Sequence, residues 1–446
     1  MPIATANLQQ GELIGMPAGR WIRQGDGRYT RQDTIRVSWV SAIDRREQEL
    51  HALPEYSAAV AFLQGNEQWA RQFDNLVGTS YMRVRLDLAQ FLDGCLGEAL
   101  TAGHEGRDPL AAAAAEASSI EGFLNARDVT VETFAPLLGF NSFGLGSVRL
   151  TPDLSVEPID EAELERLFTV GSLAPTSPRL RFFAPPSHIV RFTHRTPKGI
   201  GEVDVSSRPL TVDDPTQVAN EALDDLVAHL RVFKPGLIAV GGKASTMPPP
   251  GGGYQVHGGS SGDHLLGWRM GPFLPNAYVL GESEVPELQR FWQKVHSPRY
   301  RESRQLALAV RRFAYKGERT RVDDQLVDLI VAAEALFLGD DESGGELRFR
   351  LSTRAACYIR DPTRSRRSVY GLFMAAYRVR SRLLHGHEAK PINVAGEELT
   401  PARVVEAVEE LLRLALKQAI DEAAAGSTAW AADWEGLLFP EPPNPL

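Results

Sequence analysis

The chain has 446 residues, of which 43% are apolar and 24% charged, and a formal net charge of −9. This length suffices for two or three domains with their own cores, and the composition excludes a fibrous or wholly disordered protein. The negative charge excludes a nucleic-acid footprint spread over the whole surface, because such footprints are built from Lys and Arg. Any nucleic-acid site must therefore be local.

The cysteine content and the hydropathy pattern indicate where the protein works. Cys95 and Cys357 are the two cysteines, and each lies among apolar residues. We expect them to be buried free thiols in a reducing compartment. No run approaches 18 consecutive apolar residues, and the first twenty residues lack a signal-peptide pattern. These features predict a cytoplasmic protein that does not enter a membrane.

Residues 1–280 are predicted to form an α+β region of a family that we cannot name, with a sensor or ligand-binding role. Alternating apolar residues predict strands, spacings of three and four predict helices, and clusters of Pro and Gly predict loops. The predicted strands lie at 35–39, where Ile35, Val37 and Trp39 share one face, and at 148–150 and 189–192; the helices lie at 56–76, at 84–100, from Pro109 onward and at 161–168. The Pro- and Gly-rich stretch 246–262 is predicted to be a loop or mobile flap.

Residues 281–425 are predicted to form an all-α helical bundle. Apolar stripes at helical spacing predict helices around 285–295, 306–313, 326–337, 346–360, 366–386 and 401–424. The last of these begins with Thr400 as N-cap and Pro401 at the first helical position. The tail, 426–446, contains Trp430, Trp434 and several prolines, and we expect an extended strap that docks its aromatic side chains.

A basic segment stands out against the acidic chain. Residues 346–390 contain eleven Lys or Arg and three acidic residues, a local net charge of +8. Such a field suits a phosphate-rich ligand. Charge alone equally fits solvated helix faces, so both interpretations stay open.

Within this segment, residues 376–386 read AYRVRSRLLHG. An Arg, four residues and a His at the end of a helix resemble the signature of HEPN domains, and the longer string Tyr-x-x-Arg-Ser-x-x-x-His-Gly is similar to the Apea-like HEPN family. Val331–Leu336 and Leu347–Ser352 resemble further stretches of that family, in the same order. The resemblance covers residues 283–425.

The resemblance implies metal-independent RNA cleavage, in which a ribose 2′-OH attacks the adjacent phosphate. An imidazole that titrates near neutrality can move a proton, and a permanently charged guanidinium can hold the phosphate. His385 and Arg380 are therefore the predicted catalytic residues. Ser381 is a candidate for substrate binding or for orienting the His, or else an ordinary surface residue. Arg378 and Arg382 are candidate phosphate ligands, with solvated surface as the equally weighted alternative.

The spacing of the motif bears on assembly. Residues five apart on a straight helix point about 140° apart, so one helix does not bring Arg380 and His385 together. Gly386 is expected to end the helix and let His385 turn. The resemblance implies a homodimer, or a higher homo-oligomer, in which two copies of the motif share one cleft. Glu334 lies at the edge of an apolar stripe and is expected to pair with an Arg of a neighbouring helix.

No cofactor or metal site is predicted. Residues 241–245 look like a phosphate loop only superficially, because the spacing is wrong and no helix follows. The pair His385-x-His387 lacks the further ligands of a metal shell. The expected partner is RNA, with an unknown trigger at residues 1–280. Two hypotheses follow: a ribonuclease, acting as a toxin or antiphage-defence effector that its N-terminal region regulates, or a non-catalytic module that holds RNA or nucleotide.

Overall fold

A computed structural model of the chain divides it into two compact units, which we describe separately. It describes residues 14–23, 29–38, 47–73, 76–78, 83–85, 106–140, 142, 144–159, 187–200, 215–241, 243–246, 277–339, 346–386, 391–394 and 396–426, with a few positions between 92 and 103. The first unit comprises the described residues of 1–136, 151–222 and 242–261, and the second those of 137–150, 223–241 and 262–446.

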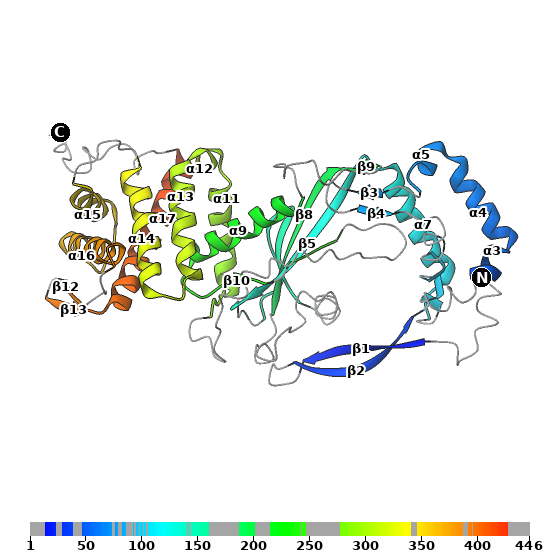
Figure 1. Cartoon of the computed structure of the whole chain (residues 1–446), viewed down its shortest axis with the longest axis horizontal. Helices are drawn as coiled ribbons and strands as arrows, with labels where there is room; N and C mark the ends of the chain where they lie inside the picture. Colours follow the sequence, from blue (N-terminus) through cyan, green and yellow to red (C-terminus); the bar gives the residue numbers. More distant parts are fainter. Residues whose placement is uncertain are drawn as a thin grey trace. The chain divides into compact units, whose positions relative to one another are not determined.

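The first unit mixes helices with antiparallel strands, as predicted (Figure 1). A hairpin pairs β1 (Ile14–Arg23) with β2 (Tyr29–Ser38). The helices are α3 (Glu47–His51), α4 (Pro54–Gly65), α5 (Glu67–Ala70) and α7 (Pro109–Asn125). A small sheet has the order β4 (Arg83–Arg85), β3 (Leu76–Gly78) and β9 (Gly199–Ile200).

A larger antiparallel sheet is built around the long strands β5 (Asp128–Leu138) and β8 (His188–Pro197). Its order is β10-β5-β8-β7-β6, with β11 also paired to β5. The remaining strands are β6 (Val148–Thr151), β7 (Leu154–Pro158), β10 (Ala239–Val240) and β11 (Ala244–Thr246). Alternate residues at the start of β5, such as Val129 and Val131, are buried, as expected for a strand with one covered face.

The helical core of the first unit gathers around one tryptophan. Trp69 packs with Leu63, Phe73 and Leu124, and its indole N–H donates to Asn125 Oδ1 at 2.9 Å. The Lys198 ammonium donates to the carbonyls of Phe123 and Leu124 at 2.6 and 3.2 Å, at the C-terminal end of α7. A cation at this end satisfies carbonyls that the helix leaves without partners.

The second unit is a helical bundle. It contains the short 3₁₀ helices η2 (Glu282–Glu284) and η3 (Lys316–Glu318), the hairpin of β12 (Ile392–Val394) and β13 (Glu397–Leu399), and the helices α11 (Val285–Val295), α12 (Pro298–Glu302), α13 (Arg304–Tyr315), α14 (Val322–Leu338), α15 (Leu347–Tyr358), α16 (Arg366–Leu384) and α17 (Pro401–Ala425). α14 contacts α13, α15, α16 and α17 (Figure 1). Most of its apolar residues are buried, because neighbours cover it on several sides.

Three segments from before residue 281 also belong to this unit: 137–150, 223–241 and the described residues of 262–280. The backbone N–H of Tyr278 donates to Gly139 O at 2.9 Å, and the Tyr278 ring stacks on Phe140. Arg231, near the end of α9 (Pro215–Phe233), donates to Ala314 O at 2.6 Å. The bundle therefore has more parts than the segment 281–425 that we predicted from the helical pattern.

The long helices agree with the sequence prediction. The six predicted helices of residues 281–425 are present, and Thr400 accepts from Arg403 N as N-cap of α17, with Pro401 at the first helical position. In the first unit, α7 begins at Pro109, and strands include residues 35–38, 148–150 and 189–192. Trp39, the helix predicted at 161–168, nearly all of the predicted loop 246–262, and the tail after Gly426 lie outside the described residues.

Other predictions were wrong in detail. The helices predicted over 56–76 and 84–100 include residues that form β3 and β4. Three-residue strands are too short to show a period of two, and partners hold them in place. We did not predict α9 or the β12–β13 hairpin. No helix among the described residues is long and apolar enough to cross a membrane. Cys95 and Cys357 are free thiols, as predicted, but only partly buried.

Candidate functional site

The predicted motif lies at the C-terminal end of α16. Ser365 caps the start of this helix by accepting from Ser368 N at 3.2 Å. His385 is its C-cap, and Gly386 follows with a φ of +76°. This left-handed conformation favours glycine after a helix end. The helix therefore ends where the sequence predicted.

The apolar spacing of residues 366–386 predicts a buried stripe of Tyr370, Phe373, Met374 and Tyr377, and the structure corrects it. Of Tyr370, Phe373, Met374 and Tyr377, only Phe373 is fully buried, and the other three are partly exposed. The buried side is formed by Val369, Leu372, Phe373, Ala376 and Val379. These residues are buried because α14, α15, α17 and β12 all contact α16.

Arg380 points toward α14. Its Nη2 lies 3.4 Å from Glu334 Oε2, and its guanidinium carbon lies 5.6 Å from the centre of the Tyr377 ring. The expected pairing of Glu334 with an Arg of a neighbouring helix is thus confirmed, and the partner is the predicted catalytic arginine. The Arg380 Nε is buried and has no hydrogen-bond acceptor among the residues that the structure describes.

Tyr377 completes this contact. Burial, the negative charge of Glu334 and a hydrogen bond with Glu334 raise the pKa of Tyr377, and the positive charge of Arg380 opposes them. The Glu334 carboxylate therefore serves two partners on α16. Tyr377, Arg380 and Glu334 form one half-buried polar cluster between α14 and α16.

His385 has a different environment. It is exposed, and its imidazole makes no hydrogen bond with any residue that the structure describes. Its backbone N–H donates to Ser381 O and Arg382 O, which holds it at the helix end. No hydrogen bond joins the Arg380 and His385 side chains within one copy of the chain, and a straight helix would point them about 140° apart.

The remaining predicted site residues lie on the outer side of the same helix. Arg378 and Arg382 are exposed and Ser381 is partly buried. Neither arginine forms an ion pair with a described residue. This environment fits a phosphate ligand and a solvated side chain equally, so the two interpretations of these arginines both stand.

The basic segment divides into internal and external arginines. Arg354 donates to Phe337 O at 2.7 Å, Arg364 pairs with two acids and Arg380 pairs with Glu334. Within residues 346–386, six arginines are exposed and have no side-chain partner among the described residues: Arg348, Arg360, Arg366, Arg367, Arg378 and Arg382. Apolar side chains lie among them, with Leu347, Phe349 and Leu384 at 38, 51 and 57% exposure.

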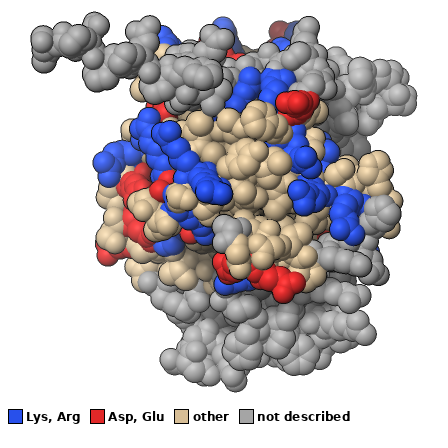
Figure 2. All heavy atoms as spheres, turned by 90° about the vertical axis from the view of Figure 1, so that its left-hand side faces the viewer, with Lys and Arg blue, Asp and Glu red and all other residues tan. Residues whose placement is uncertain are grey.

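Figure 2 shows the face of the molecule on which α15 and α16 lie. Lys and Arg side chains border an uncharged area, and the acidic groups gather toward its edges. Phe349 of α15 and Tyr370 of α16 pack edge to face with ring centres 6.3 Å apart. Basic groups beside exposed aromatic rings are the combination that binds single-stranded nucleic acid, through phosphates and base stacking respectively.

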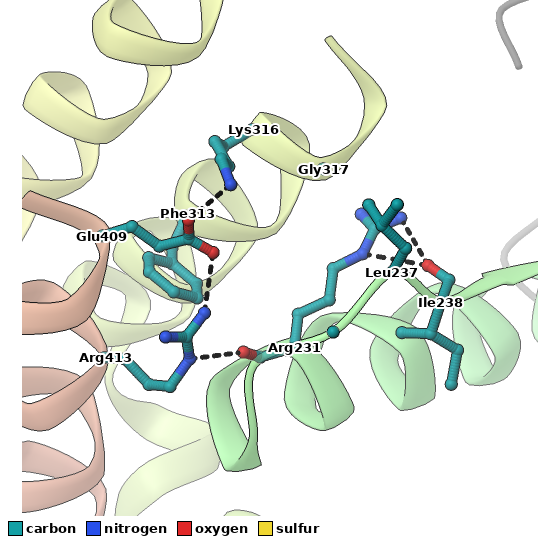
Figure 3. Close-up of a pocket in the computed structure, with 9 residues that line it drawn as sticks. Arg231, Leu237, Ile238, Phe313, Lys316, Gly317, Glu409 and Arg413 are labelled. Atoms are coloured by element: carbon teal, nitrogen blue, oxygen red, sulfur yellow. Dashed lines mark hydrogen bonds and ion pairs between the residues drawn. The ribbon is translucent and has the colours of Figure 1, made fainter. Parts of the chain in front are cut away.

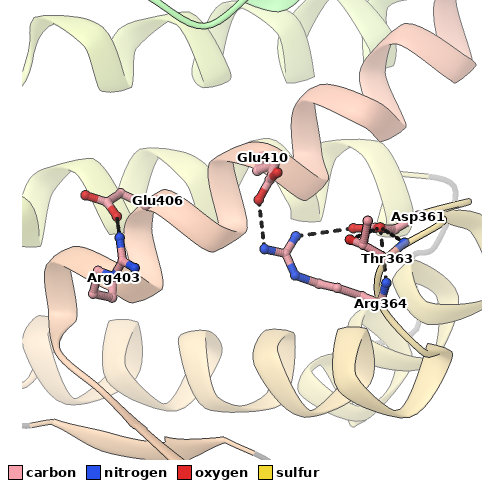
Figure 4. Close-up of polar contacts among 6 residues, drawn as sticks. All are labelled: Asp361, Thr363, Arg364, Arg403, Glu406 and Glu410. Carbon is pink, nitrogen blue, oxygen red and sulfur yellow. Dashed lines mark hydrogen bonds and ion pairs between the residues drawn. The ribbon is translucent and has the colours of Figure 1, made fainter. Parts of the chain in front are cut away.

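The turn between α15 and α16 is tied to α17 (Figure 4). Arg364 bridges Asp361 at 3.2 Å and Glu410 of α17 at 2.8 Å. The Asp361 side chain is 4% exposed and also accepts from the N–H and hydroxyl of Thr363. This contact fixes the start of α16, so Arg364 has a structural role that its place in the basic segment did not reveal.

The second unit also contains a small cavity beside Arg231 (Figure 3). It measures about 30 Å³, which holds a water molecule or two and no nucleotide. Its charged groups satisfy one another: Arg413 pairs with Glu409 at 2.7 Å, Lys316 pairs with the same carboxylate, and Arg231 donates to Ile238 O. We interpret it as a structural junction rather than a ligand site.

A second polar cluster joins α9 to α12. The His229 Nε2 lies 2.6 Å from the Tyr300 hydroxyl, and its Nδ1 lies 3.2 Å from Asp225 Oδ1. His229 and Tyr300 are 2 and 3% exposed. This Asp–His–Tyr order resembles a proton relay, but substrate has no access to it, and we assign it to packing. Sequence analysis did not find it, because Tyr300 of α12 lies about seventy residues along the chain from Asp225 and His229 of α9.

No protein-family model, curated protein or solved structure matches this chain. The resemblance of residues 283–425 to a known family therefore rests on the sequence motifs alone. No group of three or more His, Cys, Asp or Glu side chains suited to a metal ion occurs in the described part of the chain.

Proposed function

We propose that this protein is a metal-independent endoribonuclease of the HEPN type. The observation that carries the proposal is the motif Arg-x₄-His at the end of α16, on a helix pair that presents six exposed arginines. The sequence resemblance implies the reaction. The imidazole and guanidinium groups at the end of α16 suit that reaction chemically.

The reaction needs a proton carrier and a phosphate ligand. His385 is exposed and its ring nitrogens are free of described partners, so it can take the proton from an attacking 2′-OH. Arg380 can hold the phosphate as its oxygens gain negative charge, because a guanidinium stays protonated and donates in a fork.

The α15–α16 face supports RNA as the substrate. Exposed arginines can neutralise backbone phosphates, and Phe349 lies among them with a ring that is half exposed. The overall charge of −9 makes this local basic field the part of the described chain best suited to a polyanion.

The resemblance further suggests a toxin or antiphage-defence effector whose N-terminal region senses a trigger. The second candidate function is a non-catalytic module that holds RNA or nucleotide on the same face. The presence of both Arg380 and His385 favours the nuclease, because binding alone requires no proton carrier.

The test is cleavage of defined single-stranded RNA in EDTA by the full chain. We expect cleavage by the unmodified protein and a loss of about 10² to 10⁴-fold in His385→Ala, the typical contribution of a general acid–base residue. Arg403→Ala is the control, because it removes an exposed arginine that belongs to α17 and pairs with Glu406 of the same helix. RNA that binds but is never cut would favour the second candidate, and full activity in a folded His385→Ala protein would refute the catalytic assignment.

A further inference from the structure

The contact between Glu334 and Arg380 is incomplete. Arg380 is 21% exposed and Glu334 24% exposed, so solvent only partly screens the pair. Yet a single N–O distance of 3.4 Å joins them, longer than the 2.7–2.9 Å or so of a strong charge-assisted hydrogen bond. The buried Nε–H of Arg380 meets no acceptor in the described part of the chain.

The position of that unsatisfied N–H is informative. In a guanidinium, Nε–H and the nearer Nη2–H point in the same direction and form the fork that grips two oxygens of a phosphate or carboxylate. Glu334 contacts the Nη2 group only, so the Nε–H has no acceptor among the described residues. A phosphate with two oxygens on this fork would satisfy both prongs, and it would require the carboxylate to withdraw.

The Glu334 carboxylate has a second neighbour on α16. Burial and its negative charge raise the pKa of Tyr377, and the Tyr377 ring centre lies 5.6 Å from the Arg380 guanidinium carbon. When Arg380 turns to a phosphate, the Tyr377 hydroxyl remains as a donor to the carboxylate. The cost of releasing the arginine is therefore smaller than for a half-buried acid with one partner.

We propose that Glu334 is an acidic latch on Arg380, which holds the guanidinium against α14 until an RNA phosphate displaces the carboxylate. This inference rests on the proposed function and deepens it, since it concerns the access of RNA to one of the two motif residues. Glu334 acts through Arg380 and is a positioning residue, not a catalytic one.

The experiment compares Glu334→Gln with the unmodified chain in binding of a 2′-deoxy-substituted, uncleavable oligonucleotide and in cleavage of the matching RNA. Gln keeps the size of the side chain and an oxygen that can accept from Tyr377, but it removes the competing charge. We expect a Kd about three- to tenfold lower at low salt, a gain that shrinks as salt screens the charge. Glu410→Gln, which breaks a different Arg–Glu pair of the same unit, is the matched control and should show no gain.

The tighter binding expected for Glu334→Gln must depend on Arg380. In an Arg380→Ala background, Glu334→Gln should therefore change the Kd by less than twofold or so, which a purely structural role of Glu334 does not predict. Tyr377→Phe is the second variant: it leaves the carboxylate with Arg380 as its remaining partner on α16, and the Kd should rise. Weaker binding in Glu334→Gln, or tighter binding in Tyr377→Phe, would overturn the latch.

The failure of the latch and the failure of the proposed function give different results. Cleavage by the unmodified chain with no change of Kd in Glu334→Gln would remove the latch and leave the nuclease. An Arg380-dependent gain in binding, without cleavage by any variant, would keep the latch and remove the nuclease.

Discussion

At the residue scale, the two motif residues differ in what surrounds them. Arg380 is held by Glu334 and Tyr377 in a half-buried cluster, whereas His385 is exposed at a helix end. The chain can therefore lose the His385 side chain without leaving any described group unpaired. Loss of the Arg380 side chain leaves the Glu334 carboxylate without its cation.

Unfolding measurements on the two alanine variants test this difference. We expect His385→Ala to change the free energy of unfolding by less than about 0.5 kcal/mol, and Arg380→Ala to lower it by about 1 kcal/mol, since solvent weakens a half-exposed pair. Urea unfolding followed by tryptophan fluorescence measures both. A His385→Ala protein less stable than Arg380→Ala would show that His385 has a structural role.

A second prediction at this scale concerns pH. His296 packs against Trp292, donates from Nδ1 to Trp292 O at 3.0 Å and receives Arg301 Nη2 at Nε2, 2.8 Å away. Burial lowers the pKa of His296, and the positive charge of Arg301 lowers it further. The folded state therefore binds the proton less readily than the unfolded state, whose histidine titrates near pH 6.5 or so.

The sign follows from this difference. As pH falls through about 6.5, the unfolded state gains a proton that the folded state resists, so the protein loses stability. We compare the midpoint of urea unfolding with that of His296→Gln, which does not titrate, between about pH 8 and pH 5.5. The amount by which the urea midpoint of the unmodified chain exceeds that of His296→Gln should shrink as pH falls. An advantage that stays constant or grows would contradict the assigned role of Arg301.

At the element scale, the helix pair α15–α16 has one aromatic ring for packing and another at the surface. Phe373 is fully buried and packs edge to face on Phe337, with ring centres 6.3 Å apart. Phe349 is 51% exposed on α15. Residues of the same type on adjacent helices thus make a matched pair of variants.

We expect Phe373→Ala to lower the free energy of unfolding by about 3 to 5 kcal/mol, the usual cost of removing a buried Phe. Phe349→Ala should change it by less than about 1 kcal/mol but weaken RNA binding by about 1 to 3 kcal/mol, the contribution of one stacked base. Unfolding and RNA titrations on both variants check this. Unchanged RNA affinity in Phe349→Ala would remove this ring from the RNA surface.

Elements differ in how far the sequence predicts them. The helices of the bundle follow from apolar spacing and from caps such as Thr400, because these signals lie within each helix. The strand β3 does not, because one of its two partners, β9, lies more than a hundred residues away and its three residues carry no period. The pairing of Glu334 was predictable from the cost of an isolated carboxylate, but the choice of Arg380 was not. The internal role of Arg364 likewise depends on Glu410 of a separate helix.

At the scale of the whole molecule, charge is segregated. The chain carries −9 overall, yet residues 346–386 contain six exposed arginines without a side-chain partner among the described residues. Like charges on one helix pair repel unless an anion lies between them, so this face suits RNA and disfavours a bare contact with an identical face. Self-association through α16 would then be linked to RNA, which could neutralise both copies.

The last prediction concerns this assembly. Arg380 and His385 do not meet within one copy, and homo-oligomers most often have twofold symmetry, so we expect two copies to share a cleft that holds both motifs. Mixing Arg380→Ala with His385→Ala protein should then restore cleavage in EDTA that neither shows alone, since one arrangement of the mixed dimer contains an intact pair. Molar mass measured with and without an uncleavable oligonucleotide should show a dimer, which RNA stabilises. Restored cleavage should also weaken with rising salt, because phosphate contacts release counterions. A monomer that cuts RNA at the full rate would instead require Arg380 to leave Glu334 and reach the His385 end of its own helix, and the shared cleft would be refuted.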